Sequence, residues 1–274
     1  MKKYKKKILF VQPILPHYRI TFFENFNKIY DLDLFAQHKF YEKYSFKIKY
    51  AKNIKILKLF TWQQNLLSIN FKEYDLVIFN VNPKYISTLF ALIICKIKLV
   101  KTIDYNHRRS STSRSFFVFI RNLIVKIFTN GRIYYTKKEY FKEFNSNYFK
   151  FLRPINLGYS NNSIDTKLVS KLRKEYLPKT RSDFLFVGRL THKSNIKLLI
   201  NALVFSKNNY KVNILGDSQL NSKFFKKLAY KNKVENRIIW HKFSSNEIAI
   251  SNLFNSCKCF VYPGEGGLSI IHAM

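Results

Sequence analysis

Cysteine, glycine and proline are scarce in this chain of 274 residues, which has 3, 7 and 6 of them respectively. Three cysteines (Cys95, Cys257 and Cys259) are too few for a disulfide framework, and no histidine completes a zinc site beside the last two. Hydrophobic residues make up 47% and aromatic residues 17% of the chain, which excludes global disorder. We therefore expect a reduced, cytoplasmic, folded protein.

Long apolar runs are also missing. The basic start MKKYKKK is followed by an apolar run over only 8–11, which is too short for a signal peptide. The longest apolar stretch, 86–95, is interrupted at Lys96 and is far shorter than the ~20 residues that a membrane-spanning helix needs. The sequence predicts neither a signal peptide nor a membrane span.

Acidic residues are few, and the 49 Lys+Arg against 16 Asp+Glu give a formal charge of +33. Such a charge favours an anionic partner, which can be a nucleic acid, a phosphate-bearing substrate or an anionic membrane. The abundance of Lys, Asn, Ile, Phe and Tyr is also typical of AT-rich coding, which explains most of the lysine excess. The lysines are spread evenly and no nucleic-acid reader motif is present, so a basic nucleic-acid-binding protein is the weaker alternative.

Short apolar runs alternate with segments of helical periodicity along the whole chain. This alternation predicts βαβ units and mostly parallel sheets, an α/β fold. The expected strands are 7–12, 32–36, 54–60 at a sheet edge, 75–81, 99–104, 132–136, 183–189, 211–215, 237–241 and 259–262. The expected helices are 19–27, 115–128, 137–144, 195–206, 220–232 and 247–256.

The segment 153–163 (RPINLGYSNNS) breaks this rhythm and predicts a domain boundary. We expect an acceptor-side domain over 1–158 and a nucleotide-binding domain over 159–274. Two doubly wound domains in tandem bind a ligand between the carboxyl ends of their sheets. The second domain ends inside a helix and contains several strands fewer than the first, so we expect it to be incomplete.

The tail over 258–274 (KCFVYPGEGGLSIIHAM) reads as a buried strand, a glycine-rich turn and the start of a helix. Free backbone N–H groups and the helix dipole make such a turn an anion site, although an ordinary strand-to-helix turn has the same pattern. A second turn of this kind, 188–193 (GRLTHK), offers Arg189 and Lys193 to a diphosphate. Two such turns together favour the functional interpretation.

At this point the residues resemble a known family. The segments FLFVGRLTHKSNIKLLINAL, NILGDSQL and FVYPGEGGLSIIHAM are similar in order and spacing to the carboxyl-terminal domain of family 4 glycosyltransferases. The opening ILFVQPILPHYRITFFENF and the segment NLGYSNNSID resemble the start and the interdomain segment of the same family. The resemblance implies the GT-B fold, with two Rossmann-like domains.

The implied activity is a retaining transfer of a hexosyl group from a UDP- or GDP-linked sugar, with no bound metal or other cofactor. The acceptor would be a glycan or a lipid-linked glycan in cell-surface polysaccharide synthesis. The expected location is the cytoplasm, with peripheral contact at the inner face of the cell membrane.

The resemblance also assigns roles to residues. His107 and Glu265 are the expected catalytic residues. The acceptor side is expected to include His17, Arg19 and Arg108. The expected donor-binding residues are Gly188, Arg189, Lys193, Gly216, Asp217, Glu265, Gly266, Gly267, Leu268 and His272.

Two departures from the family pattern matter. Relatives carry two glutamates around the Gly-Leu turn, whereas here His272 takes the second place and Gly264 the first, with Glu265 one residue late. Relatives also continue beyond the Ala-Met pair. We therefore expect either a fragment of a longer gene product or a truncated, inactive relative that keeps only nucleotide or membrane binding, and poor stability from an unfinished second sheet.

The segment 108–128 combines cations with a wide apolar face. Its cations are Arg108, Arg109, Arg114, Arg121 and Lys126. A basic helix of this kind can lie in the headgroup region of an anionic bilayer, while the alternative is core packing in a βαβ unit.

Overall fold

The structure is a computed structural model. It describes residues 5–37, 44–56, 59–108, 115–146, 150–152, 154, 156–160, 166–175, 178, 180–216, 219–242, 244, 246–265 and 268–273. The chain divides into two compact units, Met1–Asn162 and Ser163–Met274, where the sequence analysis placed the division at 158/159.

The described strands of the N-terminal unit form a seven-stranded sheet in the order β3-β2-β1-β6-β7-β8-β9. All neighbouring strands in it are parallel. Near-continuous apolar runs such as LVIF in β6 suit this position, because a parallel sheet is covered on both faces. The strands are β1 (Lys7–Ile14), β2 (Asp31–Gln37), β3 (Lys47–Tyr50), β6 (Leu76–Phe79), β7 (Thr102–Asn106), β8 (Gly131–Tyr134) and β9 (Asn156–Tyr159).

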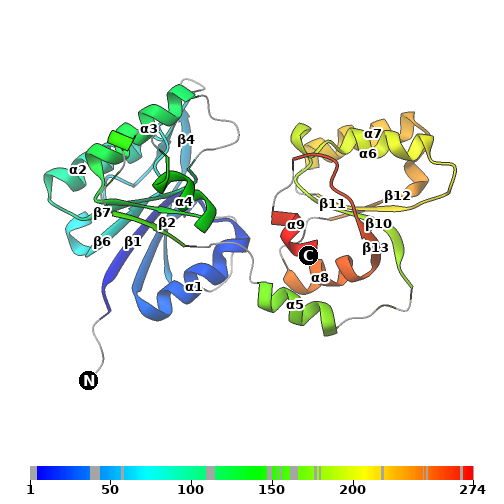
Figure 1. Ribbon diagram of the computed structural model, residues 1–274, viewed down its shortest axis with the longest axis horizontal. Helices are drawn as coiled ribbons and strands as arrows, with labels where there is room; N and C mark the ends of the chain where they lie inside the picture. The colour runs from blue at the N-terminus through cyan, green and yellow to red at the C-terminus, as the bar shows by residue number, and fades with distance from the viewer. Residues whose placement is uncertain are drawn as a thin grey trace. The chain divides into compact units, whose positions relative to one another are not determined.

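Helices cover both faces of this sheet (Figure 1). Helices α2 (Ile86–Ile97) and α3 (Ser115–Phe128) pack through Leu92 and Val125 into the cluster that contains Leu9 and Phe79. Helix α1 (Ile20–Ile29) packs through Phe23 into a second cluster with Phe10 and Tyr105 on the opposite face. Helix α4 (Lys137–Phe144) contacts β8 and β9.

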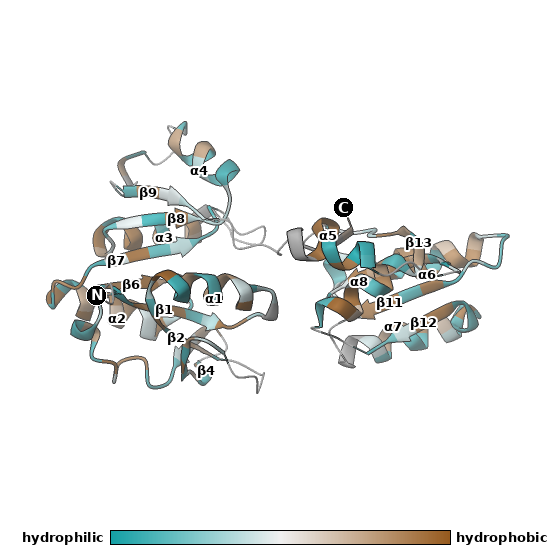
Figure 2. Ribbon diagram, turned by 90° about the horizontal axis from the view of Figure 1, so that it is seen from below, coloured by the Kyte–Doolittle hydropathy of each residue, from teal (hydrophilic) through white to brown (hydrophobic). Residues whose placement is uncertain are grey.

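The C-terminal unit has a four-stranded parallel sheet among its described residues, in the order β12-β11-β10-β13. Strand β11 is apolar along most of its length and buried (Figure 2). The strands are β10 (Ser182–Gly188), β11 (Val212–Gly216), β12 (Ile238–His241) and β13 (Cys257–Phe260). The helices are α5 (Thr166–Glu175), α6 (Ile196–Phe205), α7 (Gln219–Lys231), α8 (Glu247–Asn255) and α9 (Leu268–Ala273).

Side chains of β10 alternate between the two helical layers of this unit. Phe186 packs with α6 and α7, while Leu185 packs with Ile250 and Phe254 of α8. This period of two follows from strand geometry and produces a three-layer α/β/α sandwich. Each of the two units is thus a doubly wound, Rossmann-like domain, and the α/β prediction is confirmed.

Three local features differ from the prediction. The single edge strand expected over 54–60 is an antiparallel pair, β4 (Asn53–Ile56) and β5 (Phe60–Gln63), which forms its own two-stranded sheet among the described residues. Strand β9 lies inside the segment 153–163, which was expected to break the alternation of strands and helices, and the division between the two units at 162/163 falls in the same segment. Strand β3 and helix α5 were not predicted, because lysines interrupt the apolar pattern of both.

The strand order reverses once in each sheet. In the N-terminal unit the reversal falls between β1 and β6, and in the C-terminal unit between β10 and β13. Loops diverge at such a point and leave a crevice at the carboxyl ends of the strands, where open α/β sheets bind ligands. We therefore expect the functional side chains of each unit to lie at its reversal point.

The three cysteines occupy different environments. Cys95 in α2 and Cys257 in β13 are buried, whereas Cys259 in the same strand β13 is exposed. Burial raises the pKa of the Cys95 thiol to about 12.

Candidate active site

Two loops of the C-terminal unit meet at the reversal point between β10 and β13. Lys193, in the loop after β10, places its Nζ 3.0 Å from Oε2 of Glu265, in the loop after β13. The backbone N–H of Glu265 also donates to the carbonyl oxygen of Lys193 at 2.9 Å. Both side chains remain partly exposed, at 45% and 63%. Residues 72 positions apart in sequence thus form one polar cluster at a carboxyl edge.

Gly264 allows these loops to come so close. A Cβ at this position would lie 2.0 Å from the carbonyl oxygen of Lys193 and 2.6 Å from the backbone carbonyl carbon of Ser194. Backbone atoms cannot move aside as a flexible side chain can, so only glycine fits. The turn therefore has its carboxylate at Glu265, and no side chain has room one residue earlier, at Gly264.

The loop after β10 is folded by its own hydroxyl groups. Thr191 and Ser194 form a capping box around the short turn His192–Ser194. Ser194 is buried, and Asn195 then adopts a left-handed conformation at φ 53° before α6 begins. The exposed Arg189 lies at the start of this loop, directly after Gly188. The loop is thereby fixed with Arg189 and Lys193 at its surface.

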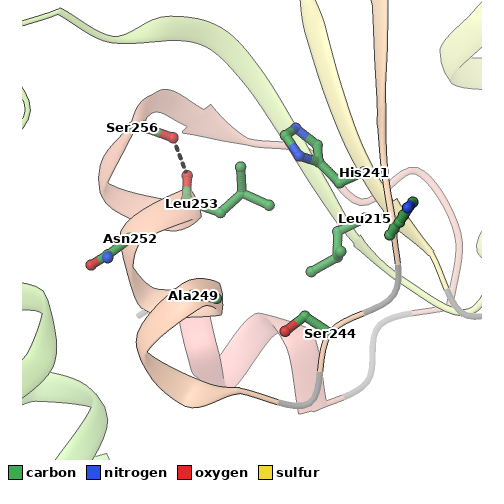
Figure 3. A pocket seen from close by; sticks show the side chains of 8 residues that line it. Leu215, His241, Ser244, Ala249, Asn252, Leu253 and Ser256 are labelled. Carbon is green, nitrogen blue, oxygen red and sulfur yellow. Dashed lines mark hydrogen bonds between the residues drawn. The ribbon is translucent and has the colours of Figure 1, made fainter.

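A pocket of about 310 Å³ lies beside the carboxyl ends of β11 and β12 and along α8 (Figure 3). Leu215 and His241 come from the two strand ends, and Ser244 from the loop that follows β12. Burial lowers the pKa of His241, so its imidazole is neutral near pH 7, and Nε2 lies 2.7 Å from Oδ1 of Asn213. The remaining lining residues are Lys242, Ala249, Asn252, Leu253 and Ser256.

In the N-terminal unit, His107 follows β7 and pairs with Glu139 of α4. Nδ1 of His107 lies 3.1 Å from Oε1 and 3.3 Å from Oε2 of Glu139. The backbone N–H of Arg108 donates to the same carboxylate at 3.1 Å. When Nδ1 carries the proton that it donates to Glu139, Nε2 of the neutral ring is left as an acceptor. The imidazole is 54% exposed and so remains open to a ligand.

Burial by itself would raise the pKa of Glu139, but the hydrogen bonds from His107 and Arg108 hold it below its usual value. Thr136 caps the amino end of α4 by accepting the backbone N–H of Glu139 at 3.1 Å. Glu139 is therefore a fixed carboxylate near pH 7.

Tyr135 supports the same cluster from the end of β8. Its ring packs edge-on against His107 with centroids 4.3 Å apart, and the guanidinium of Arg19 lies 4.7 Å from the ring centre. Asn80, after β6, donates to the Tyr135 hydroxyl at 2.8 Å, and burial raises the pKa of that hydroxyl. Groups from the ends of β1, β6, β7 and β8 thus meet at the carboxyl edge.

The structure brings together part of the expected site. Gly188, Arg189, Lys193 and Glu265 come to the β10/β13 edge, and Gly216 ends the neighbouring strand β11. Asp217, Gly266 and Gly267 lie outside the described residues, and the side chains of His17, Leu268 and His272 are likewise not described.

Two arginines expected on the acceptor side are occupied within the unit. Arg19 is 8% exposed and donates to Oε1 of Gln12 at 3.0 Å. Arg108 is bound to Glu143 through Nε at 2.7 Å. Arg121, expected among the cations around the apolar face of α3, is instead buried and donates to the carbonyl oxygen of Arg108.

Sequence reasoning did not find Glu139, Tyr135 or His241. The pattern Thr136-x-x-Glu139 is a recognisable helix start, but it does not reveal the contact with His107, 32 residues away. Within the described ranges, no group of three His, Cys, Asp or Glu side chains is placed to hold a metal ion.

The family comparison concerns the C-terminal unit. Residues 170–274 match the model of the family described as glycosyl transferases group 1. No curated protein sequence matches this chain.

Solved structures match both units. Anabaena Alr3699/HepE in complex with UDP-glucose is similar with a TM-score of 0.68 and 17% identity, over 98% of this chain and 78% of that one. A glycosyltransferase from Rickettsia africae has a TM-score of 0.64 and 14% identity, over 96% and 74%. UDP-N-acetylglucosamine 2-epimerase from Rickettsia bellii has a TM-score of 0.57 and 11% identity, over 94% and 74%. The chain has the GT-B fold.

Proposed function

We propose that this protein is a retaining glycosyltransferase that transfers a hexosyl group from a UDP- or GDP-linked sugar to a glycan or lipid-linked acceptor. The observation that carries the proposal is the cluster of Arg189, Lys193 and Glu265 at the β10/β13 reversal point. It lies inside the segment that matches the group 1 family model. The acceptors we propose are those of cell-surface polysaccharide synthesis.

The chemistry explains why these groups are needed. Transfer breaks the bond between the anomeric carbon and the bridging oxygen of the diphosphate, and negative charge develops on the departing nucleoside diphosphate. Arg189 and Lys193 supply positive charge where it develops, and no metal or other cofactor is required for that role in our proposal. Glu265 accepts hydrogen bonds from hydroxyl groups of the donor and holds Lys193 in place before the donor binds.

The pocket between β11, β12 and α8 is the site we propose for the nucleobase. Its lining is apolar at Leu215 and polar at His241 and Ser244, as a base with a flat ring and hydrogen-bonding edges requires. Leu215 directly precedes Gly216, and a Cβ on Gly216 would lie 2.4 Å from the Leu190 side chain of the loop after β10. The loop after β10 thus packs on the end of β11, the strand that also contributes Leu215 to the proposed base pocket.

His107 is the acceptor-side residue of the proposal. Glu139 leaves its Nε2 as a hydrogen-bond acceptor or, in the protonated ring, as a donor. We assign Nε2 to a hydroxyl of the reacting sugar or of the acceptor. His17, Asp217, Gly266, Gly267, Leu268 and His272 remain proposed site residues on the resemblance alone.

The fold alone does not select this chemistry, because an epimerase acting on UDP-N-acetylglucosamine is among the structural neighbours. The match of residues 170–274 to a glycosyltransferase family supports transfer over epimerisation. HepE, solved with UDP-glucose, supports a UDP-linked donor.

The test is transfer or hydrolysis of radiolabelled UDP-glucose and GDP-mannose by the purified chain, with UDP and GDP binding measured by calorimetry. Lys193→Ala should lower kcat/KM about 100-fold, since it removes a cation from the leaving group. Lys197→Ala, which changes an exposed lysine at the second position of α6, is the matched control and should act as wild type.

Arg189→Ala should likewise lower kcat/KM. Its matched control is Arg181→Ala, at an exposed arginine beside the opposite end of β10, which should act as wild type. Nucleotide binding without turnover would support the alternative of an inactive relative. Absence of binding to any nucleotide, or equal losses in the variants and the controls, would refute the proposal.

A further inference from the structure

A chain of hydrogen bonds crosses the sheet of the C-terminal unit and ends in the pocket beside α8. Nε2 of His241 in β12 lies 2.7 Å from Oδ1 of Asn213 in β11. Nδ2 of Asn213 donates at 2.6 Å to Oγ of Ser182, the first residue of β10. Asn213 is 5% exposed, so its amide is enclosed by protein. A buried amide that is bonded at both ends is held in one orientation.

The direction of this chain of bonds follows from its far end. The hydroxyl group of Ser182 donates at 3.2 Å to the carbonyl oxygen of Ser256, a group that can only accept. Oγ of Ser182 therefore accepts from Asn213, whose Nδ2 also lies 3.5 Å from Sγ of Cys257. The amide nitrogen thus faces Ser182 and Cys257, and the amide oxygen faces His241. An oxygen acceptor beside Nε2 places the ring proton on Nε2.

The second ring nitrogen of His241, Nδ1, is then left with a lone pair. Burial lowers the pKa of His241, so the ring is neutral near pH 7 and Nδ1 accepts hydrogen bonds. No hydrogen bond involves Nδ1 in the part of the chain that the structure describes. Figure 3 shows His241 beside Leu215 on the strand side of the pocket, with Ala249 and Leu253 of α8 on the other side. The pocket thus contains a hydrogen-bond acceptor of fixed polarity.

We infer that His241 selects nucleotides whose base has a ring N–H group on its pairing edge, as uracil has at N3 and guanine at N1. Cytosine and adenine have a lone pair at the same positions, so two acceptors would face each other in the pocket. His241 is thereby a specificity-determining residue, and Asn213 is a positioning residue that acts through it. Base selection of this kind rests on the proposed function, because it requires the pocket to hold the base.

The experiment is calorimetric titration of the full chain with UDP, CDP, GDP and ADP. UDP and CDP have the same ribose, diphosphate and ring size, so they differ only at the pairing edge of the base. UDP should bind about tenfold or more tightly than CDP, and GDP should likewise bind more tightly than ADP. His241→Phe keeps a flat ring in the pocket but has no acceptor, and should bring the affinities for UDP and CDP close together.

Asn213→Asp tests the same assignment in the opposite direction. A carboxylate beside Nε2 stabilises the doubly protonated ring, so Nδ1 becomes a donor. The preference should then shift toward CDP by about tenfold or more. The matched control is Asn201→Asp on α6, where the native side chain accepts from Asn232. It adds the same charge away from the pocket and should keep the wild-type preference.

Nitrogen-15 NMR of His241 in the nucleotide-free chain reads the tautomer directly and should show the proton on Nε2. A proton on Nδ1 would overturn the inference, as would a preference for UDP that Asn213→Asp leaves unchanged. Equal affinities for all four nucleotides would also overturn it, while leaving the proposed function in place. Absence of binding to any of them would refute the proposed function, and the base selection with it.

Discussion

Glu139 determines which ring nitrogen of His107 carries the proton. It accepts from Nδ1, and its carboxylate is fixed by Arg108 and by the cap of α4. Glu139→Gln should lower kcat about 10-fold to 100-fold with little change in KM, because the neutral amide no longer favours one tautomer of the ring. Nitrogen-15 NMR of His107 gives a readout independent of turnover. An unchanged tautomer in Glu139→Gln would contradict the positioning role even if activity fell.

The same carboxylate predicts a pH dependence of stability. The pKa of Glu139 in the folded chain is below its ordinary value of 4.5, so the unfolded chain binds its proton more readily. The stabilisation is therefore complete above pH 4.5 and is lost as the pH falls through the lower folded pKa. Urea unfolding of wild type and Glu139→Gln should show curves that differ at pH 7 and converge in acid. A difference that grows on acidification would contradict this assignment.

For single residues, the sequence could predict which side chains belong to the candidate site but not which side chains they contact. Lys193 and Glu265 were predicted from two glycine-bearing turns, because such turns have a local signature. The pairs His107–Glu139 and Arg19–Tyr135 arise only when the ends of separate strands meet at one edge. No local pattern encodes that meeting.

At the scale of the element, the loop after β13 depends on glycine. Gly264→Ala should displace the loop from Lys193 and Ser194, because the added methyl would overlap backbone atoms at 2.0 Å and 2.6 Å. We expect a loss of about 1–3 kcal/mol in the free energy of unfolding, together with weaker nucleotide binding. Thermal denaturation and calorimetry measure the two effects. Gly158→Ala in β9, where the nearest atom is 3.9 Å away, is the control that should change neither.

Helices and central strands were predicted well because their apolar period is strong. Helices α3 and α4 have the expected bounds, Ser115–Phe128 and Lys137–Phe144. The strand predicted over 54–60 covers most of β4 and only the first residue of β5, because the alternation of apolar residues and lysine in the sequence gives no sign of the chain reversal. Strand β9 was missed because Asn and Gly are poor strand formers, and pairing with β8 overrides that preference.

At the scale of the whole molecule, the formal charge of +33 is a destabilising term. Like charges repel more strongly when the chain is compact, and salt screens that repulsion. The melting temperature should therefore rise between 20 and 300 mM sodium chloride. A protein with similar numbers of acidic and basic residues on its surface would show little change. Differential scanning fluorimetry across this range checks it. A melting temperature that falls with salt would show that the ion pairs outweigh the repulsion.

The contrast between Cys259 and the other two thiols has a practical consequence. With Cys95 and Cys257 enclosed by the core, a maleimide should modify Cys259 alone in the native chain. That thiol lies six residues before Glu265, in the strand that leads into the turn that we propose binds the donor. A single fluorophore placed there without any engineered cysteine would report on nucleotide occupancy, and the wild-type chain would serve as its own sensor.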